Sequence, residues 1–226
     1  MERQVDLKDI SDGKLYGLND MVKVCANNCD GCSACCHGRG DTITLDPLDV
    51  HFLKQGLQAD FTKLMAGAVS LGVVKGVIRP SMAMTNEEDS KCVFLNEEGR
   101  CSIHKFRPGL CRLFPLGRVY EEDGLKYILL TGECVREKRT KEKVYKWIGM
   151  PNMAAYEKYL IIWHDFIKTV EVMIAEESDD EAFVKNLNMY LLQKFYVTDF
   201  GETLDDFYEN FYQRLEETFA LFEIEQ

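Results

Sequence analysis

Four cysteines lie within eight residues near the start of this chain, in the pattern Cys29-x2-Cys32-x2-Cys35-Cys36. This pattern restricts the fold strongly, because thiolates at three-residue intervals on a loop can converge on one metal centre. Iron–sulfur clusters and zinc knuckles both use this arrangement. The pattern therefore predicts a loop folded around a metal.

A second group of candidate ligands follows about sixty residues later in the sequence. Its members are Cys92, Cys101, His104, Cys111 and Cys134. Turn-forming residues at 96–99 should bring Cys101 back towards Cys92. Cys101-x2-His104 has the spacing of a ligand pair, since imidazole and thiolate both suit zinc and iron. His104 could equally donate to sulfur from outside the ligand shell.

Two arginines, Arg107 and Arg112, bracket Cys111 in the segment RPGLCRLFP. An arginine beside a thiol lowers the pKa of that thiol and offsets the negative charge of sulfur ligands. We therefore expect both arginines to lie at the site that binds the metal cofactor.

The adjacent pair Cys35 and Cys36 raises the question of one centre or two. Consecutive side chains in extended backbone point to opposite sides, so Cys35 would complete the series and Cys36 would face elsewhere. We expect Cys36 to face a second centre or the segment 107–112. Cys25 breaks the three-residue interval, and its role is open between a small buried hydrophobe and a further thiol of the site.

The remaining histidines are expected to have ordinary roles. His37 directly follows the cysteine pair and is predicted to be a neighbour of the site and not a ligand. His51 and His164 lie in helical patterns and are predicted to be ordinary helix residues.

Nine cysteines in a chain without a signal peptide do not suit a secreted disulfide framework, so we expect reduced thiols and a cytoplasmic location. The formal net charge of −11 disfavours binding to nucleic acids or anionic membranes. No apolar run is long enough to span a bilayer. Metal ions are therefore the expected partners, and neither nucleic acid nor membrane is.

Composition changes sharply after Arg139. Residues 1–139 hold all 9 cysteines and 14 of the 16 glycines, whereas residues 140–226 hold 8 basic and 18 acidic residues and read as helical throughout. We predict an α+β protein with a cysteine-cluster metal-binding domain at 1–139 and an acidic helical region at 140–226. The acidic helices are a candidate surface for a protein partner.

Periodicity and cap residues predict the secondary structure. Asp46 with Pro47 should open a helix over 48–56, Asp60 one over 61–69, and Asn152 one over 153–177. Further helices are predicted at 15–24, 141–149, 179–196 with a capping box of Ser178 and Glu181, and from about Thr203. Strands are predicted at 76–84, 91–95, 116–121 and 125–130, with the last two forming a hairpin.

An apolar stripe marks the last helix. Its members are Phe207, Phe211, Leu215, Phe219 and Phe222. We interpret the stripe as core packing, because an amphipathic helix needs a buried face.

Both cysteine blocks resemble the YkgJ-type cysteine-cluster family, described as a zinc- or iron-chelating domain. The matching segments are CDGCSACC at 29–36, TITLDPLDV at 42–50, CVFLNEEGRCSIHKFRPGLCRLFP at 92–115 and GEC at 132–134. The resemblance covers roughly residues 25–136 and implies metal chelation by the clustered cysteines. The family's cysteine motif is similar to that of flagellin lysine N-methylases, which implies an iron–sulfur centre and a modifying activity.

The spacing of the cysteines favours an iron–sulfur cluster over zinc. Three thiols lie close together in sequence, and a distant segment supplies the fourth ligand, as in ferredoxins. Structural zinc sites usually pair two CxxC knuckles, whereas this chain has one CxxCxxC run, so zinc is the alternative. Two other functions stay open: an enzyme that uses the metal on a protein or small molecule, and a structural interaction protein. For an enzyme, Cys25 and Cys36 would be the leftover thiols, with Arg107 or Arg112 as anion-binding partners.

Overall fold

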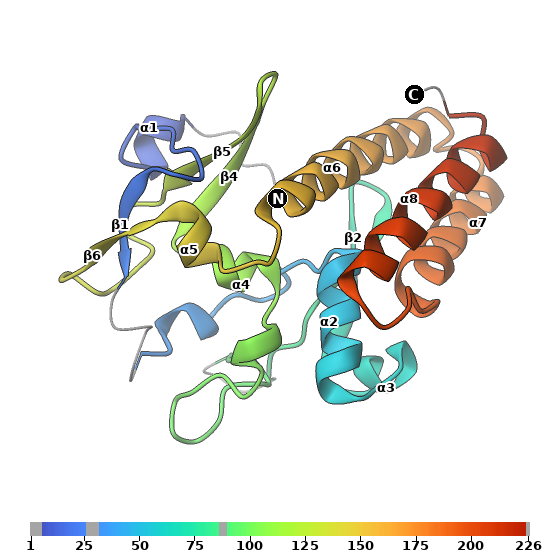
Figure 1. Ribbon diagram of the computed structural model, residues 1–226. Coiled ribbons are helices and arrows are strands. Elements are labelled where there is room, and N and C mark those ends of the chain that lie inside the picture. The colour runs from blue at the N-terminus through green and yellow to red at the C-terminus, as the bar shows by residue number, and fades with distance from the viewer. Residues whose placement is uncertain (1–5, 26–31, 86–89, 225–226) are drawn as a thin grey trace. The chain divides into compact units, whose positions relative to one another are not determined.

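The computed structural model describes residues 6–25, 32–85 and 90–224. Short antiparallel strands occupy its first half and helices most of the rest, which confirms the α+β class (Figure 1). Two compact units are each discontinuous in sequence. The first comprises the chain up to Ile43 with Ala83–His104 and Gly109–Phe166, and the second comprises Thr44–Met82, Lys105–Pro108 and the chain from Ile167. The division into domains at residue 139 stays a prediction.

The first unit is built on two antiparallel strand pairs with short helices. Its elements are α1 (Leu7–Ile10), β1 (Met21–Cys25), η2 (Ala34–Cys36), α4 (Gly109–Leu113), β4 (Leu116–Glu121), β5 (Gly124–Leu129), β6 (Thr140–Lys143), α5 (Val144–Ile148) and the first part of α6 (Met153–Glu176). β4 and β5 form the predicted hairpin, with Leu116 opposite Leu129. β1 pairs with β6, with Met21 opposite Lys143.

The helix predicted at 15–24 is wrong, because residues 21–25 form strand β1. Val22 and Val24 are buried and alternate with exposed Met21 and Lys23, which is the period of a strand. The partner strand β6 lies far away in sequence, so local periodicity carried no sign of the pairing.

The second unit combines one strand pair with helices. Its elements are α2 (Pro47–Leu57), α3 (Phe61–Met65), β2 (Val69–Val74), β3 (Val77–Met82), α7 (Glu181–Leu192), the π-helical turn η4 (Gln193–Val197), α8 (Leu204–Leu221) and the last part of α6; the short 3₁₀ helix η3 (His104–Phe106) crosses the unit boundary. β2 and β3 pair with Val69 opposite Met82. α3 therefore ends earlier than predicted, because buried Val69 begins a strand. The predicted strand at 91–95 is also wrong, since Cys92 and Leu95 form only single bridges.

Cap residues set most helix starts as predicted. The side chains of Asp46 and Asp49 form a capping box on α2, and Thr203 and Asp206 form one on α8. The Asn152 side chain accepts a hydrogen bond of 3.3 Å from the Ala155 N–H at the start of α6. The cap predicted at Ser178 is wrong. Asp180 caps α7 instead, because its carboxylate accepts from the Phe183 N–H.

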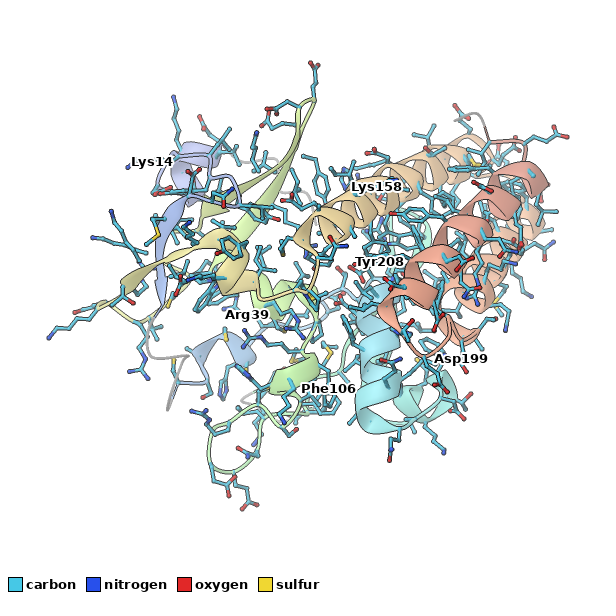
Figure 2. All side chains as sticks on the ribbon, viewed as in Figure 1. Lys14, Arg39, Phe106, Lys158, Asp199 and Tyr208 are labelled. Atoms are coloured by element: carbon cyan, nitrogen blue, oxygen red, sulfur yellow. The ribbon has the colours of Figure 1, made fainter. Side chains whose placement is uncertain are left out.

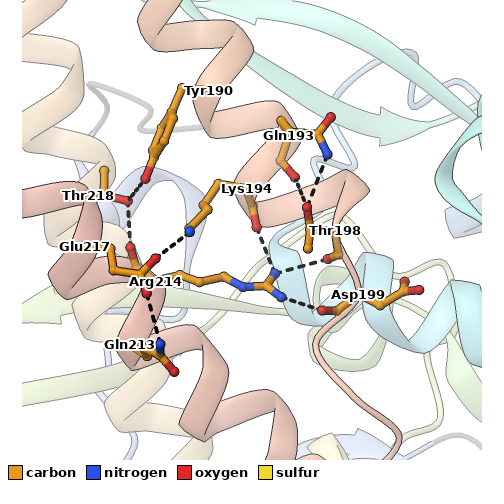
Figure 3. Close-up of polar contacts among 9 residues, drawn as sticks. All are labelled: Tyr190, Gln193, Lys194, Thr198, Asp199, Gln213, Arg214, Glu217 and Thr218. Carbon is orange, nitrogen blue, oxygen red and sulfur yellow. Dashed lines mark hydrogen bonds and ion pairs between the residues drawn. The ribbon is translucent and has the colours of Figure 1, made fainter. Parts of the chain in front are cut away.

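The stripe on α8 packs into the core, as predicted. Phe207, Phe211 and Leu215 are buried, and the Phe207 and Phe211 rings lie 6.0 Å apart. On the same helix the guanidinium of Arg214 donates to the carbonyls of Lys194 and Thr198, at 2.8 and 3.1 Å, and to that of Asp199 (Figure 3). These bonds satisfy the carbonyls that the end of η4 leaves without helical partners.

None of the described helices has both the length and the apolar character needed to cross a membrane.

Candidate metal centre

The first cysteine block folds as a tight turn. Cys35 and Cys36 lie in the 3₁₀ helix η2, where the Cys36 N–H donates to the Ser33 carbonyl at 2.8 Å. The extended backbone assumed for this pair is therefore wrong. A 3₁₀ helix turns adjacent side chains by about 120°, so neighbours need not face opposite ways. The argument that separated the pair by direction therefore no longer holds.

Backbone pairing brings the second block against the first. The Cys92 N–H donates to the Cys36 carbonyl at 2.8 Å, and the Gly38 N–H donates to the Ser90 carbonyl at 2.7 Å. His37 forms a bridge with Lys91 between these two bonds, which makes it a neighbour of the site. Segments distant in sequence are thus held together by main-chain hydrogen bonds.

The turn predicted at 96–99 is confirmed, and it returns Cys101 towards Cys92. The Asn96 N–H donates to the Arg100 carbonyl at 2.9 Å, and Leu95 pairs with Cys101. Gly99 has a φ of 70°, which is the left-handed conformation that such a turn requires. Cys101 consequently lies within electrostatic range of Cys92.

Four thiols lie on the segments that these backbone bonds join, and we call them the four-thiol group: Cys35, Cys36, Cys92 and Cys101. The hydrogen bond from Cys35, burial and the neighbouring thiols all raise the pKa of Cys36. Burial raises the pKa of Cys92, and the charges of Cys101 and Cys35 add to the effect. Deprotonating such a group is unfavourable without a cation, and a soft metal ion that binds thiolate would supply that cation.

The donor chemistry fits zinc or an iron–sulfur centre, since all four donors are sulfur. Across residues 6–25, 32–85 and 90–224, no three His, Cys, Asp or Glu side chains are placed closely enough to hold a metal ion together. Cys29 lies outside the described residues, as does the side chain of Cys25. None of the seven cysteines whose side chains the structure describes forms a disulfide: Cys32, Cys35, Cys36, Cys92, Cys101, Cys111 and Cys134.

The other predicted site residues lie at the following positions along the chain. Cys32 precedes η2, and exposed His104 begins η3. Cys111 lies in α4, and half-buried Arg107 and Arg112 flank it as the sequence requires. The Trp147 indole N–H donates to the Leu113 and Phe114 carbonyls at 3.2 and 3.1 Å and so fixes the end of α4. Whether Cys32, His104, Cys111, Cys134 and the two arginines serve the metal stays a prediction.

Arg39, which is labelled in Figure 2, was not anticipated from the sequence. It contacts three segments that carry or adjoin cysteines. Its Nε atom donates to the Cys35 carbonyl at 3.3 Å, and its Nη1 atom forms an ion pair with the Glu133 carboxylate at 3.0 Å. The guanidinium carbon lies 5.3 Å from the centre of the Phe114 ring. A signal existed, because Arg39 stands between two glycines directly after the Cys-Cys-His run.

His51 and His164 are helix residues, as predicted. His51 is buried in α2 against Phe207, with the ring centres 5.2 Å apart. His164 lies in α6 and stacks on Tyr120 at 3.7 Å. Neither histidine belongs to the four-thiol group.

A family model described as "CxxCxxCC: Putative zinc- or iron-chelating domain" matches residues 28–145, slightly more than half of the chain. The matched span contains both cysteine blocks and Arg39. Comparison with curated proteins and with solved structures returned no match.

Proposed function

The chain belongs to the CxxCxxCC family of zinc- or iron-chelating domains, and from this we propose that it holds a thiolate-bound metal centre between its two cysteine blocks. The observation that carries the proposal is the four-thiol group, in which η2 is hydrogen-bonded to the Cys92 segment. Structural positioning of soft donors from distant segments is what a metal site requires.

The proposed ligand set extends beyond the four-thiol group. It comprises Cys29, Cys32, Cys35, Cys36, Cys92, Cys101, Cys111 and Cys134, with His104 as a nitrogen donor. Eight thiols would suffice for two four-thiolate centres. Arg107 and Arg112 would offset the negative charge that accumulates on the sulfur ligands.

For the metal we favour an iron–sulfur cluster, with zinc as the alternative. Ferredoxins bind their clusters with three cysteines close in sequence and one distant cysteine. In this chain the three would be Cys29, Cys32 and Cys35, and the distant one a residue such as Cys92. The chain departs from the ferredoxin pattern because Cys36 directly follows Cys35 and no proline comes after it. A zinc site would instead use all four thiols of the four-thiol group as a closed tetrahedral set.

We place the protein in the cytoplasm, where thiols are kept reduced. This location suits the seven cysteines whose side chains the structure describes, because none of them forms a disulfide. The region 140–226 carries a net charge of −10, from 8 basic and 18 acidic residues, and we propose it as the surface for a protein partner with a basic face.

Purification of the full chain without oxygen, followed by metal analysis and an absorption spectrum, tests the proposal. An iron–sulfur cluster gives a brown protein with sulfide-to-iron charge-transfer bands, and zinc gives a colourless protein with bound zinc. Removal of the metal by a chelator should also lower the melting temperature, because ligands distant in sequence close the site. A folded protein that binds neither metal under reducing conditions would refute the proposal.

A further inference from the structure

We propose that Arg39 is the positioning residue of the metal centre. Its guanidinium holds η2 in place through the Cys35 carbonyl and ties that turn to the segment of Cys134 and to the end of α4. This inference rests on the proposed metal-binding function and adds a residue that holds the ligands without touching the metal.

Three contacts define this role. The Arg39 Nε atom donates to the Cys35 carbonyl, and its Nη1 atom donates to the Glu133 carboxylate. Two edges of one rigid guanidinium therefore bind two segments. The face of the same group lies over the Phe114 ring. A planar fork with five fixed donors can meet these demands together, whereas an ammonium group is a single point of charge.

The backbone around Arg39 is fixed on both sides. Gly38 and Gly40 have φ values of 62° and 54°, which other residues adopt only with strain. The Arg39 carbonyl accepts hydrogen bonds from the Thr42 N–H at 3.1 Å and from the Thr42 hydroxyl at 2.7 Å. The Gly38 N–H donates to the Ser90 carbonyl, so the backbone next to Arg39 is paired with the segment that leads to Cys92.

Burial makes the ion pair effective. The Arg39 and Glu133 side chains are 26% and 25% exposed, so water screens their attraction less than it would at the surface. Glu133 directly precedes Cys134, and Phe114 ends the segment that begins with Cys111. Arg39 therefore couples the positions of three thiol-bearing segments within one unit.

We infer that Arg39 acts through the geometry of its guanidinium and less through its positive charge. Glu133 already compensates the guanidinium, so little net positive charge is left to stabilise thiolates. Lysine at this position would keep the charge and lose the fork. If positioning dominates, Arg39→Lys should behave more like Arg39→Met than like the wild type.

The test compares full-length variants purified without oxygen and titrated with Zn²⁺ against a competing chelator. Arg39→Met should lower the apparent affinity by about 10- to 100-fold, the range found when groups that orient ligands are removed. Glu133→Ala should also weaken binding, and Glu133→Gln should do so less, because its amide oxygen still accepts from the guanidinium.

Arg118→Met is the matched control. Arg118 is a half-buried arginine of the same unit that donates to the Tyr156 hydroxyl at 2.9 Å and lies over that ring. Co²⁺ substitution supplies a readout that general loss of stability does not move, since the thiolate-to-cobalt bands report how many sulfurs bind and in what geometry. These bands should change in the Arg39 variants and stay as in the wild type for Arg118→Met.

The outcomes separate the two proposals. If the wild type binds neither zinc in this titration nor an iron–sulfur cluster when purified without oxygen, the proposed function fails and this inference fails with it. If the wild type binds and Arg39→Met matches it in affinity and cobalt spectrum, only the role of Arg39 is refuted. Should Arg39→Met fail to fold, as judged by circular dichroism, Arg39→Lys and Glu133→Ala decide in the same way.

Discussion

The N–H group of Cys92 donates a hydrogen bond of 2.8 Å to the carbonyl of Cys36. This single bond joins the two cysteine blocks directly at their thiol-bearing residues. Neighbouring pairs on the same ladder, His37 with Lys91 and Gly38 with Ser90, fix its register. The main chain thus holds candidate ligands from both blocks on adjoining segments.

Loss of any one thiol of the four-thiol group should therefore have the same effect. Cys35→Ser, Cys36→Ser and Cys92→Ser are each expected to lose the same metal to a similar extent, because the backbone bond between Cys36 and Cys92 holds these thiols on adjoining segments. Metal content per chain and the absorption spectrum of protein purified without oxygen measure this. Cys25→Ser serves as the control and should change little.

Different metal losses in Cys35→Ser and Cys36→Ser would instead assign the adjacent thiols to two centres. That result would restore the separation expected from extended backbone, despite the 3₁₀ turn at Ala34–Cys36.

Sequence patterns anticipated features with local causes. Residues close in sequence determine the N-cap of Asp46 on α2, the start of α8 near Thr203, the hairpin of β4 and β5, and the turn that returns Cys101. The proximity of the two blocks also followed from ligand chemistry, because thiols crowded in two runs need a common partner.

The features that the sequence did not predict depend on contacts between residues far apart in the chain. Strand β1 depends on β6, and no periodicity within 15–24 could reveal a partner so distant. The Cys92 segment binds η2 through the Cys36 carbonyl, and the ion pair of Arg39 joins residues 94 positions apart. Such contacts can be read from one sequence only when the residue types themselves demand a partner.

A second prediction concerns His51, which should make the protein less stable in mild acid. Burial lowers the pKa of His51 from 6.5 to about 4, with a smaller contribution from Lys54, while Asp199 and Asp206 act in the opposite direction. Its Nε2 atom is buried and has no hydrogen-bond partner among the residues that the structure describes. The folded protein therefore favours the neutral ring.

Since the unfolded chain takes up this proton near pH 6.5 and the folded chain only near pH 4, stability falls as the pH drops through that window. The full difference corresponds to roughly 3 kcal/mol, of which about 2 kcal/mol should be lost at about pH 5. Urea unfolding of metal-free protein near pH 7 and pH 5 measures it, with His51→Leu as the comparison. An equal pH dependence in both proteins would show that His51 is not responsible.

A third prediction tests why a glycine stands inside helix α2. A Cβ atom at Gly56 would lie 2.4 Å from Cγ of Phe106, far inside contact distance. Alanine normally stabilises a helix relative to glycine by about 0.5–1 kcal/mol, but here overpacking should cost about 1–3 kcal/mol. The sign of the change in unfolding free energy is therefore diagnostic.

Gly67→Ala is the control for this experiment, because nothing lies within 4 Å of its added Cβ. It should leave the stability nearly unchanged. Adding Phe106→Leu to Gly56→Ala should recover part of the loss, since the smaller side chain makes room. A Gly56→Ala protein more stable than the wild type would contradict the close approach of Phe106.

The last prediction concerns Arg214, whose guanidinium closes the end of η4 (Figure 3). It bonds the carbonyls of Lys194, Thr198 and Asp199 and lies 4.0 Å from the centre of the Phe200 ring. Arg214→Met keeps the apolar stem but leaves these carbonyls without their donor, so we expect a loss of at least about 2 kcal/mol in unfolding free energy. Arg214→Lys should recover only part of it, because a single ammonium cannot reach acceptors on two edges of the fork. Urea unfolding followed by circular dichroism measures both, and the exposed neighbour change Gln213→Met should stay within about 0.5 kcal/mol of the wild type. Equal midpoints for Arg214→Met and Gln213→Met would mean that the carbonyls find water or other donors, and that the guanidinium does not hold this turn.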